Sequence, residues 1–395
     1  MERREFILKT GTMITSTAFL SSFGNVNSLL ANSAKSDNAV QPDKRPDPDN
    51  FAQPILKAIA LGINAPSPHN TQSWKFKILS DIQMELFVDE NILLPATDPP
   101  SRQIHMGAGC FIETMVQGAS RFGYEARVTY FPEGYSSDKD FGQKPVASIS
   151  LSQTNLEEDA LAKFIETRQT NRRTYKGNLI SISEYNELLE LTGPQHANTR
   201  LINKNFQSFF DLFYRGFEIE SKTFRTNEET RNLFRFSEEE RARKCDGISI
   251  PQMGYRGIMK NLAENSLDEG NKEKWHSDKS IKLSLRNVEK GIESSRGILI
   301  WYTETNEYLD WVKTGRDYVR LSHAMTSKGL FTHPYNQAIQ EYDEMKEVRN
   351  RLNELLQIKD PQKIQMIVRI GRSSTPYYAY RRNIKDYIIG QLHNL

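Results

Sequence analysis

Residues 65–74 read Ala-Pro-Ser-Pro-His-Asn-Thr-Gln-Ser-Trp, and the expected fold can be built outward from this stretch. Its two prolines stiffen the backbone, and its amide side chains can both donate and accept hydrogen bonds. A flat heteroaromatic ring with imide and carbonyl edges needs such a surface. Composition alone favours an ordinary proline-rich turn. We call residues 66–72 the ring segment.

Helical and extended patterns alternate around the ring segment. Ile55, Ile59 and Ile63 recur every fourth residue, which predicts a helix within 51–64. Trp74 opens an alternating pattern that is typical of a half-buried strand. The same part of the chain predicts a partner strand at 83–88, a helix at 104–122 that ends at Gly123, and an extended segment at 126–131.

A similar plan recurs later in the chain. A helix is expected near Leu156, a buried strand at 297–302, a helix containing Tyr318 that ends at Gly329, and a strand at 364–370. Because Gly123 and Gly329 close comparable helices, we expect an internal duplication, for which chance similarity is the competing explanation. The sequence therefore predicts an α+β protein with two halves, at 51–157 and 158–395.

Residues 203–285 separate the elements of the second half and are helical and highly charged. One interpretation of their aromatic residues is core packing against the body of the protein. The other is a lid over a pocket, because long excursions in compact domains are often lids. Both interpretations are kept, and five phenylalanines form the stripe in question: Phe206, Phe209, Phe210, Phe213 and Phe217.

Two short basic groups are candidates for anion binding. Arg168, Thr170 and Arg172 fall within six residues, and guanidinium and hydroxyl groups can bind a phosphate dianion through charge-assisted hydrogen bonds. Arg381 and Arg382, placed just before an expected C-terminal helix, have the same potential. A solvated basic turn is the alternative for both groups.

Overall charge excludes some classes of function. Lys and Arg number 52 and Asp and Glu 50, which gives a formal net charge of +2 without a basic cluster. The chain is therefore not expected to bind nucleic acid.

The seven histidines show no metal-ligand spacing, so no metal site is expected. Cys110 and Cys245 are too few for a disulfide framework, and whether they pair is left open.

The N-terminus resembles an export signal. Arg3 and Arg4 precede an apolar stretch at 11–23, and small residues at 31–34 offer a cleavage site. This predicts a twin-arginine signal peptide over 1–34, recognition by the twin-arginine translocase and a periplasmic location. The alternative is a frayed amphipathic N-terminus with a chance arginine pair. Residues 35–50 have the composition of a flexible linker.

Taken together, these segments resemble the nitroreductase family of FMN-binding oxidoreductases, and more closely its Acg-type subgroup, whose members often carry twin-arginine signals. The resemblance spans essentially the whole chain after the signal. At 72–74 the family commonly has Gln-Pro-Trp where this chain has Gln-Ser-Trp. The landmarks are 65–74, 94–99 with Arg102, 168–173 with Tyr175, 246–248, 329–330 with 334–337, and 381–382.

The resemblance implies specific roles for these residues. Arg168, Thr170 and Arg172 would hold the FMN phosphate with support from Arg381 or Arg382. His69, Tyr335 and Asn336 would line a substrate pocket. Against the flavin ring would lie Pro66, Ser67, Pro68, Asn70 and Gln72.

The resemblance also implies a fold and an activity. The expected fold is a nitroreductase-like one duplicated within one chain, with mostly antiparallel central sheets, flanking helices and a helical lid insertion. A single chain would then be its own pseudo-dimer with one FMN site, and hence a monomer. The expected activity is electron transfer through FMN, with NAD(P)H as reductant, to a small electron-poor acceptor such as a nitroaromatic or quinone. The alternatives are an FMN-binding storage or sequestration protein without turnover, and an exported solute-binding protein without flavin.

Overall fold

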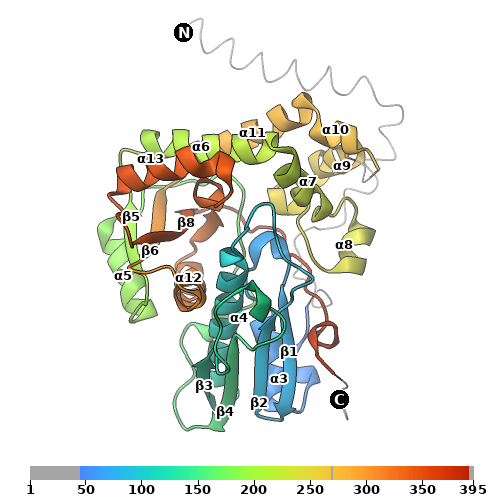
Figure 1. The fold of residues 1–395 in the computed structure, drawn as a ribbon, viewed down its shortest axis with the longest axis vertical. Helices are drawn as coiled ribbons and strands as arrows, with labels where there is room; N and C mark the ends of the chain where they lie inside the picture. Colours follow the sequence, from blue (N-terminus) through green and yellow to red (C-terminus); the bar gives the residue numbers. More distant parts are fainter. Residues whose placement is uncertain (1–44, 268–269, 391–395) are drawn as a thin grey trace, which may run out of the picture.

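The computed structural model describes residues 45–267 and 270–390, which form two four-stranded antiparallel sheets (Figure 1). The expected signal peptide and residues 35–44 of the expected linker lie outside the described residues. The first sheet contains β1 (Trp74–Ser80), β2 (Gln83–Val88), β3 (Tyr124–Tyr130) and β4 (Ala147–Gln153). The second contains β5 (Asn198–Ile202), β6 (Gly297–Thr303), β7 (Phe331–Pro334) and β8 (Lys363–Gly371).

Both sheets have the same connectivity. Their strand orders are β1-β2-β4-β3 and β5-β6-β8-β7, and every pair is antiparallel. In each sheet a long helix joins the second strand to the third: α4 (Arg102–Ser120) and α12 (Tyr308–Ser327). Each helix is followed by a left-handed glycine, Gly123 with φ 74° and Gly329 with φ 66°. The expected duplicated α+β fold is therefore confirmed.

The two long helices cross closely and join the halves. A Cβ atom added to Gly109 of α4 would lie 1.9 Å from the carbonyl oxygen of Val312. One added to Gly315 of α12 would lie 2.0 Å from the carbonyl oxygen of Met106. Each helix thus uses a glycine to admit the backbone of the other. Farther along the crossing, Oε1 of Gln117 lies 2.8 Å from Nδ1 of His323, a pair separated by 206 residues.

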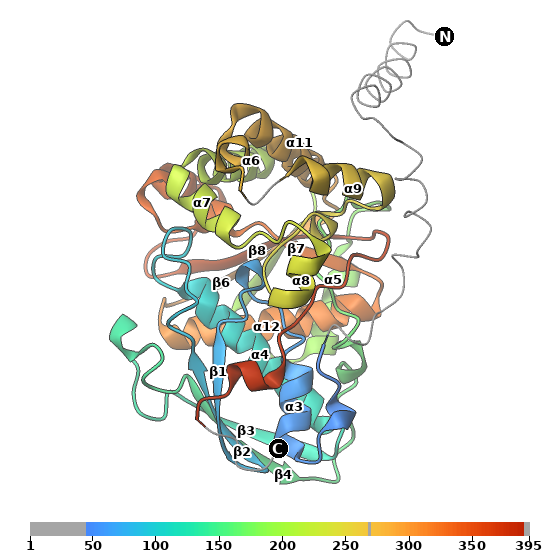
Figure 2. The same cartoon turned by 90° about the vertical axis from the view of Figure 1, so that its right-hand side faces the viewer.

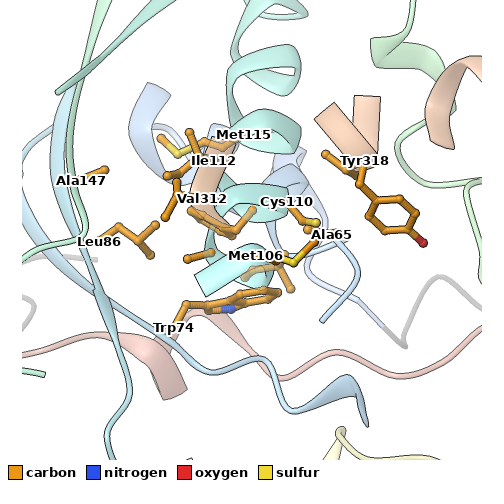
Figure 3. Packing of buried hydrophobic residues seen from close by; sticks show 14 of the residues in the cluster. Ala65, Trp74, Leu86, Met106, Cys110, Ile112, Met115, Ala147, Val312 and Tyr318 are labelled. Carbon is orange, nitrogen blue, oxygen red and sulfur yellow. The ribbon is translucent and has the colours of Figure 1, made fainter. Parts of the chain in front are cut away.

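One hydrophobic core runs through both halves. Figure 3 shows Val312 of α12 among the α4 side chains Met106, Ile112 and Met115, with Trp74 of β1 close by. The same cluster continues into the second sheet through its buried strand residues. The halves therefore cannot separate without exposing a shared apolar interior, which is the dominant stabilising term for a folded chain.

The insertion between β5 and β6 is helical and extends past residue 285. Phe209 and Phe213 pack with Ile298 and Ile367 of the second sheet, which confirms the core interpretation of the aromatic stripe. Figure 2 shows the later helices reaching over the side of the molecule where the C-terminal segment runs. The helices are α6 (Gln207–Lys222), α7 (Phe224–Asn232), α8 (Glu238–Lys244), α9 (Gly257–Ser266), α10 (Lys272–His276) and α11 (Asp278–Glu293).

Other helices complete the fold. The helix expected before the ring segment is α3 (Pro54–Gly62), whose isoleucines are fully buried, while α5 (Ile182–Thr192) and α13 (Lys346–Leu356) belong to the second half. The helix expected near Leu156 is wrong: only a short 3₁₀ turn (Ala162–Phe164) forms there. Asp159 accepts from the amide of Leu161, and this local bond competes with helix formation. None of the described helices is long and apolar enough to cross a membrane.

The C-terminal segment returns to the first half. Instead of the expected helix it forms a 3₁₀ turn (Ile384–Tyr387), and Ile388 makes a parallel bridge with Phe76 of β1 (Figure 2). Tyr387 packs against Trp74, with their ring centroids 6.3 Å apart. The sequence range 158–395 is therefore not one spatial unit, because its last residues cover the first half.

Candidate functional site

The ring segment has an unusual backbone. His69, Asn70 and Gln72 all have positive φ angles, of 47°, 56° and 53°. Left-handed conformations are uncommon for residues other than glycine, and they cluster at functional sites. Ser67 supports the shape, because its Oγ accepts from the amide of Gln72 at 3.0 Å. The segment is therefore a fixed surface and not a loose turn.

Two side-chain atoms of the ring segment are buried without a protein partner. They are Nδ1 of His69 and Oδ1 of Asn70. Burial, with a smaller contribution from nearby Arg172, lowers the pKa of His69 to about 4. The imidazole is therefore neutral at pH 7 and cannot act as a cationic proton donor there. Pro66, Ser67 and Pro68 are half-buried beside these groups.

Gln72 is occupied by the chain itself, which corrects its expected contact with the flavin ring. Its Nε2 donates to the carbonyls of Asn70 at 3.2 Å and Cys245 at 2.9 Å. Its Oε1 accepts from the amide of Arg382 at 3.1 Å and from the hydroxyl of Tyr387. The side chain is fully buried and has no donor or acceptor left for a ligand.

Arg382 is likewise engaged within the protein. Its Nη2 donates to the carbonyls of Thr71 and Gln72, and its guanidinium lies over the ring of Tyr387 at 5.1 Å. Its amide also binds Gln72. Arg382 thus attaches the C-terminal segment to the ring segment, while its buried Nε has no hydrogen-bond partner. Its expected role in holding phosphate stays a prediction.

Three other arginines converge on Asn64, two residues before the ring segment. Nη1 of Arg45 donates to its Oδ1 at 2.8 Å, and Nη2 of Arg168 donates to its carbonyl at 3.2 Å. Nη2 of Arg381 approaches the same carbonyl at 3.5 Å. Residues from the N-terminal segment, the second half and the C-terminal segment therefore meet at one point of the first half. We call Arg45, Arg168 and Arg381 the arginine cluster.

Arg168 is the member of the arginine cluster with most capacity for a ligand. It is only 2% exposed, yet its Nε and Nη1 have no hydrogen-bond partner, and neither has the buried Nε2 of Gln169 beside it. Burial lowers the pKa of Arg168, and its electrostatic neighbours are Tyr318, Cys110 and Tyr378. Figure 3 shows Cys110 of α4 close to Ala65, with Tyr318 projecting from α12.

The cluster lacks compensating negative charge. The pKa of Arg381 is held well below its usual value by burial and by Arg45 and Arg168. The pKa of Arg45 is lowered to about 10 by burial and by Arg168, against opposing contributions from Tyr378 and Glu166. Glu166 itself binds Arg121 at 2.9 Å. Each nitrogen of Arg45 and Arg381 donates to a protein oxygen, so the unpartnered donors here belong to Arg168 and Gln169. Because burying unpaired charges is costly, these donors beside two further guanidiniums fit a multivalent oxyanion such as a phosphate monoester.

Arg172 and Thr170 occupy a different part of the site. Arg172 influences His69 of the ring segment, and burial lowers its own pKa to about 10. Tyr318 and Arg369 are among the neighbours that also affect the pKa of Arg172. Thr170 is half-buried and bridges to Thr332 of β7. Arg172 therefore lies next to the ring segment, whereas Arg168 lies in the arginine cluster.

Tyr335 and Asn336 fill the second half and do not line an open pocket, which corrects their expected role. Tyr335 is 1% exposed and packs against Phe213 and Phe217 of α6 at ring distances of 5.8 and 5.2 Å. Oδ1 of Asn336 accepts from the amide of Ile367 at 3.0 Å. Both residues therefore hold the insertion and β8 in place.

The insertion touches the ring segment directly. Besides the bond from Gln72 to Cys245, the amide of Gly247 donates to the carbonyl of Asn70 at 3.2 Å. The residues after α8 thus cover one side of the ring segment.

Cys110 and Cys245 are both free thiols, so the two cysteines do not form a disulfide in this structure.

Other features of the described residues do not point to a competing site. A groove of about 1140 Å³ lies between α6 and α13, and most of its lining residues are charged or polar. Its residues include none of the arginine cluster or the ring segment. Within residues 45–267 and 270–390, no group of three or more His, Cys, Asp or Glu side chains is arranged to hold a metal ion.

Sequence reasoning missed Arg45 and Asn64. Arg45 lies in a stretch rich in proline and aspartate, whose composition indicates a linker, and no periodic pattern marks it. Asn64 directly follows the apolar face of α3, where a polar residue at a helix end is ordinary. Their roles depend on contacts 124 and 104 residues away in sequence, to Gln169 and Arg168.

Comparisons with known proteins give partial similarity. No protein-family profile matches the chain. A putative NAD(P)H nitroreductase of Mycobacterium tuberculosis is 29% identical over 124 residues, which is 31% of this chain and 35% of that protein. The putative NAD(P)H nitroreductase Acg of the same bacterium is 35% identical over 78 residues, 20% of this chain and 23% of that protein. The matches thus span about a third or less of these curated relatives.

Two solved structures that partly resemble the chain are a nitroreductase-like protein and a nitroreductase. A nitroreductase-like family protein from Bacillus cereus has a TM-score of 0.33 at 15% identity, covering 62% of this chain and all of that one. The FMN-dependent nitroreductase NfnB from Mycobacterium smegmatis, solved with NADPH, has a TM-score of 0.35 at 10% identity, covering 59% of this chain and 98% of that one.

Proposed function

We propose that the chain is an FMN-binding oxidoreductase of the nitroreductase family, of the Acg type, with one flavin site per chain. The observation that carries the proposal is the arginine cluster. Three guanidiniums, of which those of Arg168 and Arg381 are buried and that of Arg45 is half-buried, meet two residues before a rigid segment with unpartnered polar atoms. A phosphate at the cluster and a ring at the segment would satisfy both groups at once. The partial similarity to putative NAD(P)H nitroreductases supports the proposal.

The residues have separate proposed roles. Arg168 holds the phosphate through its free Nε and Nη1, supported by Arg381. His69, Asn70 and the half-buried residues before them contact the ring. Arg172 lies beside His69, so we assign it to the ring and its negative charge on reduction. Gln72 and Arg382 shape the segment from behind, and Gln72 does not contact the ligand.

Bound FMN would supply the redox chemistry, by accepting electrons from a pyridine nucleotide and passing them to a small electron-poor acceptor. The protein's own residues position the ring, restrict water and stabilise negative charge near Arg172. No side-chain acid or base is required of the chain for this role. This agrees with a neutral His69.

A titration tests the flavin proposal. Purified protein should quench FMN fluorescence with a one-to-one endpoint, and Arg168→Ala combined with Arg172→Ala should abolish the quenching. Arg127→Ala, an exposed arginine on β3, is the control that should bind as the parent does. Failure of the parent protein to bind FMN would rule out the proposed function. The flavin absorbance should then bleach with NADPH and return with a nitroaromatic or quinone.

Sequestration of FMN without turnover is the second candidate, and a specific observation favours it. The insertion is bonded to the ring segment at Cys245 and Gly247, so it covers one side of the proposed ring site. Bound flavin that no pyridine nucleotide reduces, but that dithionite does reduce, would favour sequestration over catalysis.

We also propose export by the twin-arginine pathway, in which a protein folds and binds its cofactor before it crosses the membrane. Arg3 and Arg4 support this proposal. Replacing both by lysine should retain the protein in the cytoplasm, measured by cell fractionation. Unchanged fractionation would exclude the pathway.

The pseudo-dimer proposal predicts a monomer of 45.5 kDa before any cleavage, measurable by light scattering.

A further inference from the structure

We propose that Arg45, which precedes α3 in a segment with the composition of a linker, is a phosphate-binding residue that makes the site selective for phosphorylated flavin. The inference rests on the proposed flavin function, which it deepens by assigning a residue outside the two basic groups of the sequence. Arg45 would complete a three-guanidinium cradle with Arg168 and Arg381.

The position of Arg45 is fixed from three sides. Its Nη1 donates to Oδ1 of Asn64 at 2.8 Å, and its Nη2 donates to Oε1 of Gln169 at 3.1 Å. Nε and Nη2 donate to the carbonyl of Ala379 at 3.2 and 3.1 Å. The guanidinium therefore joins the first half, the second half and the C-terminal segment at one point.

These contacts satisfy the nitrogens of Arg45 but leave its positive charge uncompensated. Two of the partners are neutral amide side chains and the third is a backbone carbonyl. None of these partners carries a negative charge that would offset the cost of burying the guanidinium. Gln169 turns its Oε1 to Arg45 and leaves its buried Nε2 without a partner, as Arg168 leaves its Nε and Nη1. Three unpartnered donor atoms, on Arg168 and Gln169, thus lie beside Arg45, and a phosphate dianion would satisfy them.

The side chain is also held from outside the cluster. The guanidinium of Arg45 lies 5.5 Å from the ring centre of Tyr378, in the C-terminal segment. Asp47 then begins a short turn (Pro48–Asn50) that leads into α3. The segment therefore fastens Arg45 across the phosphate position and limits the freedom that a long side chain would otherwise lose on binding.

Affinity for two flavins tests the inference in the full-length chain. Arg45→Met should weaken FMN binding about tenfold or more, because it removes a charge-assisted contact. Riboflavin, which lacks the phosphate, should bind both proteins within about twofold. Arg45→Lys should recover part of the FMN affinity, and Arg127→Met is the surface control. Equal losses for FMN and riboflavin would overturn the inference, since they would show a structural role only, as would unchanged FMN affinity.

A second measurement separates this inference from the flavin proposal. The melting temperature of the flavin-free protein should rise with inorganic phosphate relative to chloride at equal ionic strength, and Arg45→Met should remove the rise. If the parent protein bound no FMN but kept this Arg45-dependent rise, the flavin proposal would fail and the anion site would stand. No rise in the parent protein would overturn the anion site. Should Arg45→Met fail to fold, Arg45→Gln, which keeps a donor for Asn64, decides the same outcomes.

Discussion

Nη2 of Arg168 donates to the carbonyl of Asn64 at 3.2 Å, across 104 residues of sequence. This bond brings the basic group of the second half to the start of the ring segment in the first half. A binding site for one elongated ligand then follows from how the halves pack, because neither half contains both ends of it.

Arg168→Met should stabilise the flavin-free protein and abolish its stabilisation by FMN. The guanidinium is 2% exposed with two unpartnered nitrogens, so an apolar side chain of similar length removes an uncompensated charge. We expect a gain of about 1–3 kcal/mol in the free energy of unfolding, measured by urea denaturation. Arg127→Met should change neither quantity. A large loss of stability in Arg168→Met would mean that its bond to Asn64 outweighs the buried charge.

Gln72→Ala should loosen the insertion from the ring segment. The substitution leaves the amide of Arg382 and the hydroxyl of Tyr387 without an acceptor and breaks the bond to Cys245. We expect a loss of about 3 kcal/mol in unfolding free energy. Amide hydrogen exchange at 245–250 should also become faster. The exposed Gln143→Ala is the matched control, and unchanged exchange in Gln72→Ala would argue against this attachment.

The stability of Asp317→Asn relative to the parent protein, measured as free energy of unfolding, should increase as pH rises from about 4 to about 7. Burial raises the pKa of Asp317 from 3.8 to about 7 despite its bonds from the amides of His196 and Ala197. The folded parent protein therefore keeps a proton that the unfolded chain has lost, and its stability falls through this window. The asparagine does not titrate. Its advantage should grow by about 2–4 kcal/mol between pH 4 and 8.

Denaturation midpoints at several pH values measure that advantage. The exposed Asp81→Asn provides the control, because it has no comparable burial. A difference between Asp317→Asn and the parent protein that stays constant with pH, or shrinks as pH rises, would contradict the assignment of a protonated carboxyl at this position.

Gly109→Ala and Gly315→Ala should each destabilise the crossing of α4 and α12. The added Cβ would lie 1.9 and 2.0 Å from backbone carbonyl oxygens, which cannot move like a flexible side chain. We expect losses of about 1–3 kcal/mol, despite the better helix propensity of alanine, from thermal or urea unfolding. Gly107→Ala is the matched control on α4, since its Cβ would approach no atom closer than 3.3 Å. Equal effects at Gly107 and Gly109 would contradict the close approach.

Periodicity predicted most of the elements that build the two halves. The strand expected at 83–88 is β2, and the helices ended by Gly123 and Gly329 are α4 and α12. It failed near Leu156 because the side chain of Asp159 bonds to the local backbone. It could not show that the C-terminal segment joins β1, since that contact depends on the other half of the chain.

For the site, sequence indicated chemistry better than orientation. The structure gives residues 66–72 a fixed backbone and Arg168 a buried guanidinium, and their predicted ligand contacts stay predictions. Composition could not show that Gln72 points inward to Cys245. Nor could it predict the positive φ angles of His69, Asn70 and Gln72, none of which is a glycine. Arg45 had no local signal, because its partners are distant in sequence and its neighbours have the composition of a linker.

The packing of α4 against α12 within one chain has a consequence for evolution, because the two halves can change in sequence independently. In an assembly of two identical chains, every substitution appears on both sides of the symmetry axis. Here the two copies are encoded separately, so each can change alone. The first copy keeps the ring segment before β1, whereas the corresponding place before β5 has His196 and Ala197 bonded to Asp317. Covalent linkage thus permits a division of labour, in which one copy supplies a ligand surface and the other becomes scaffold.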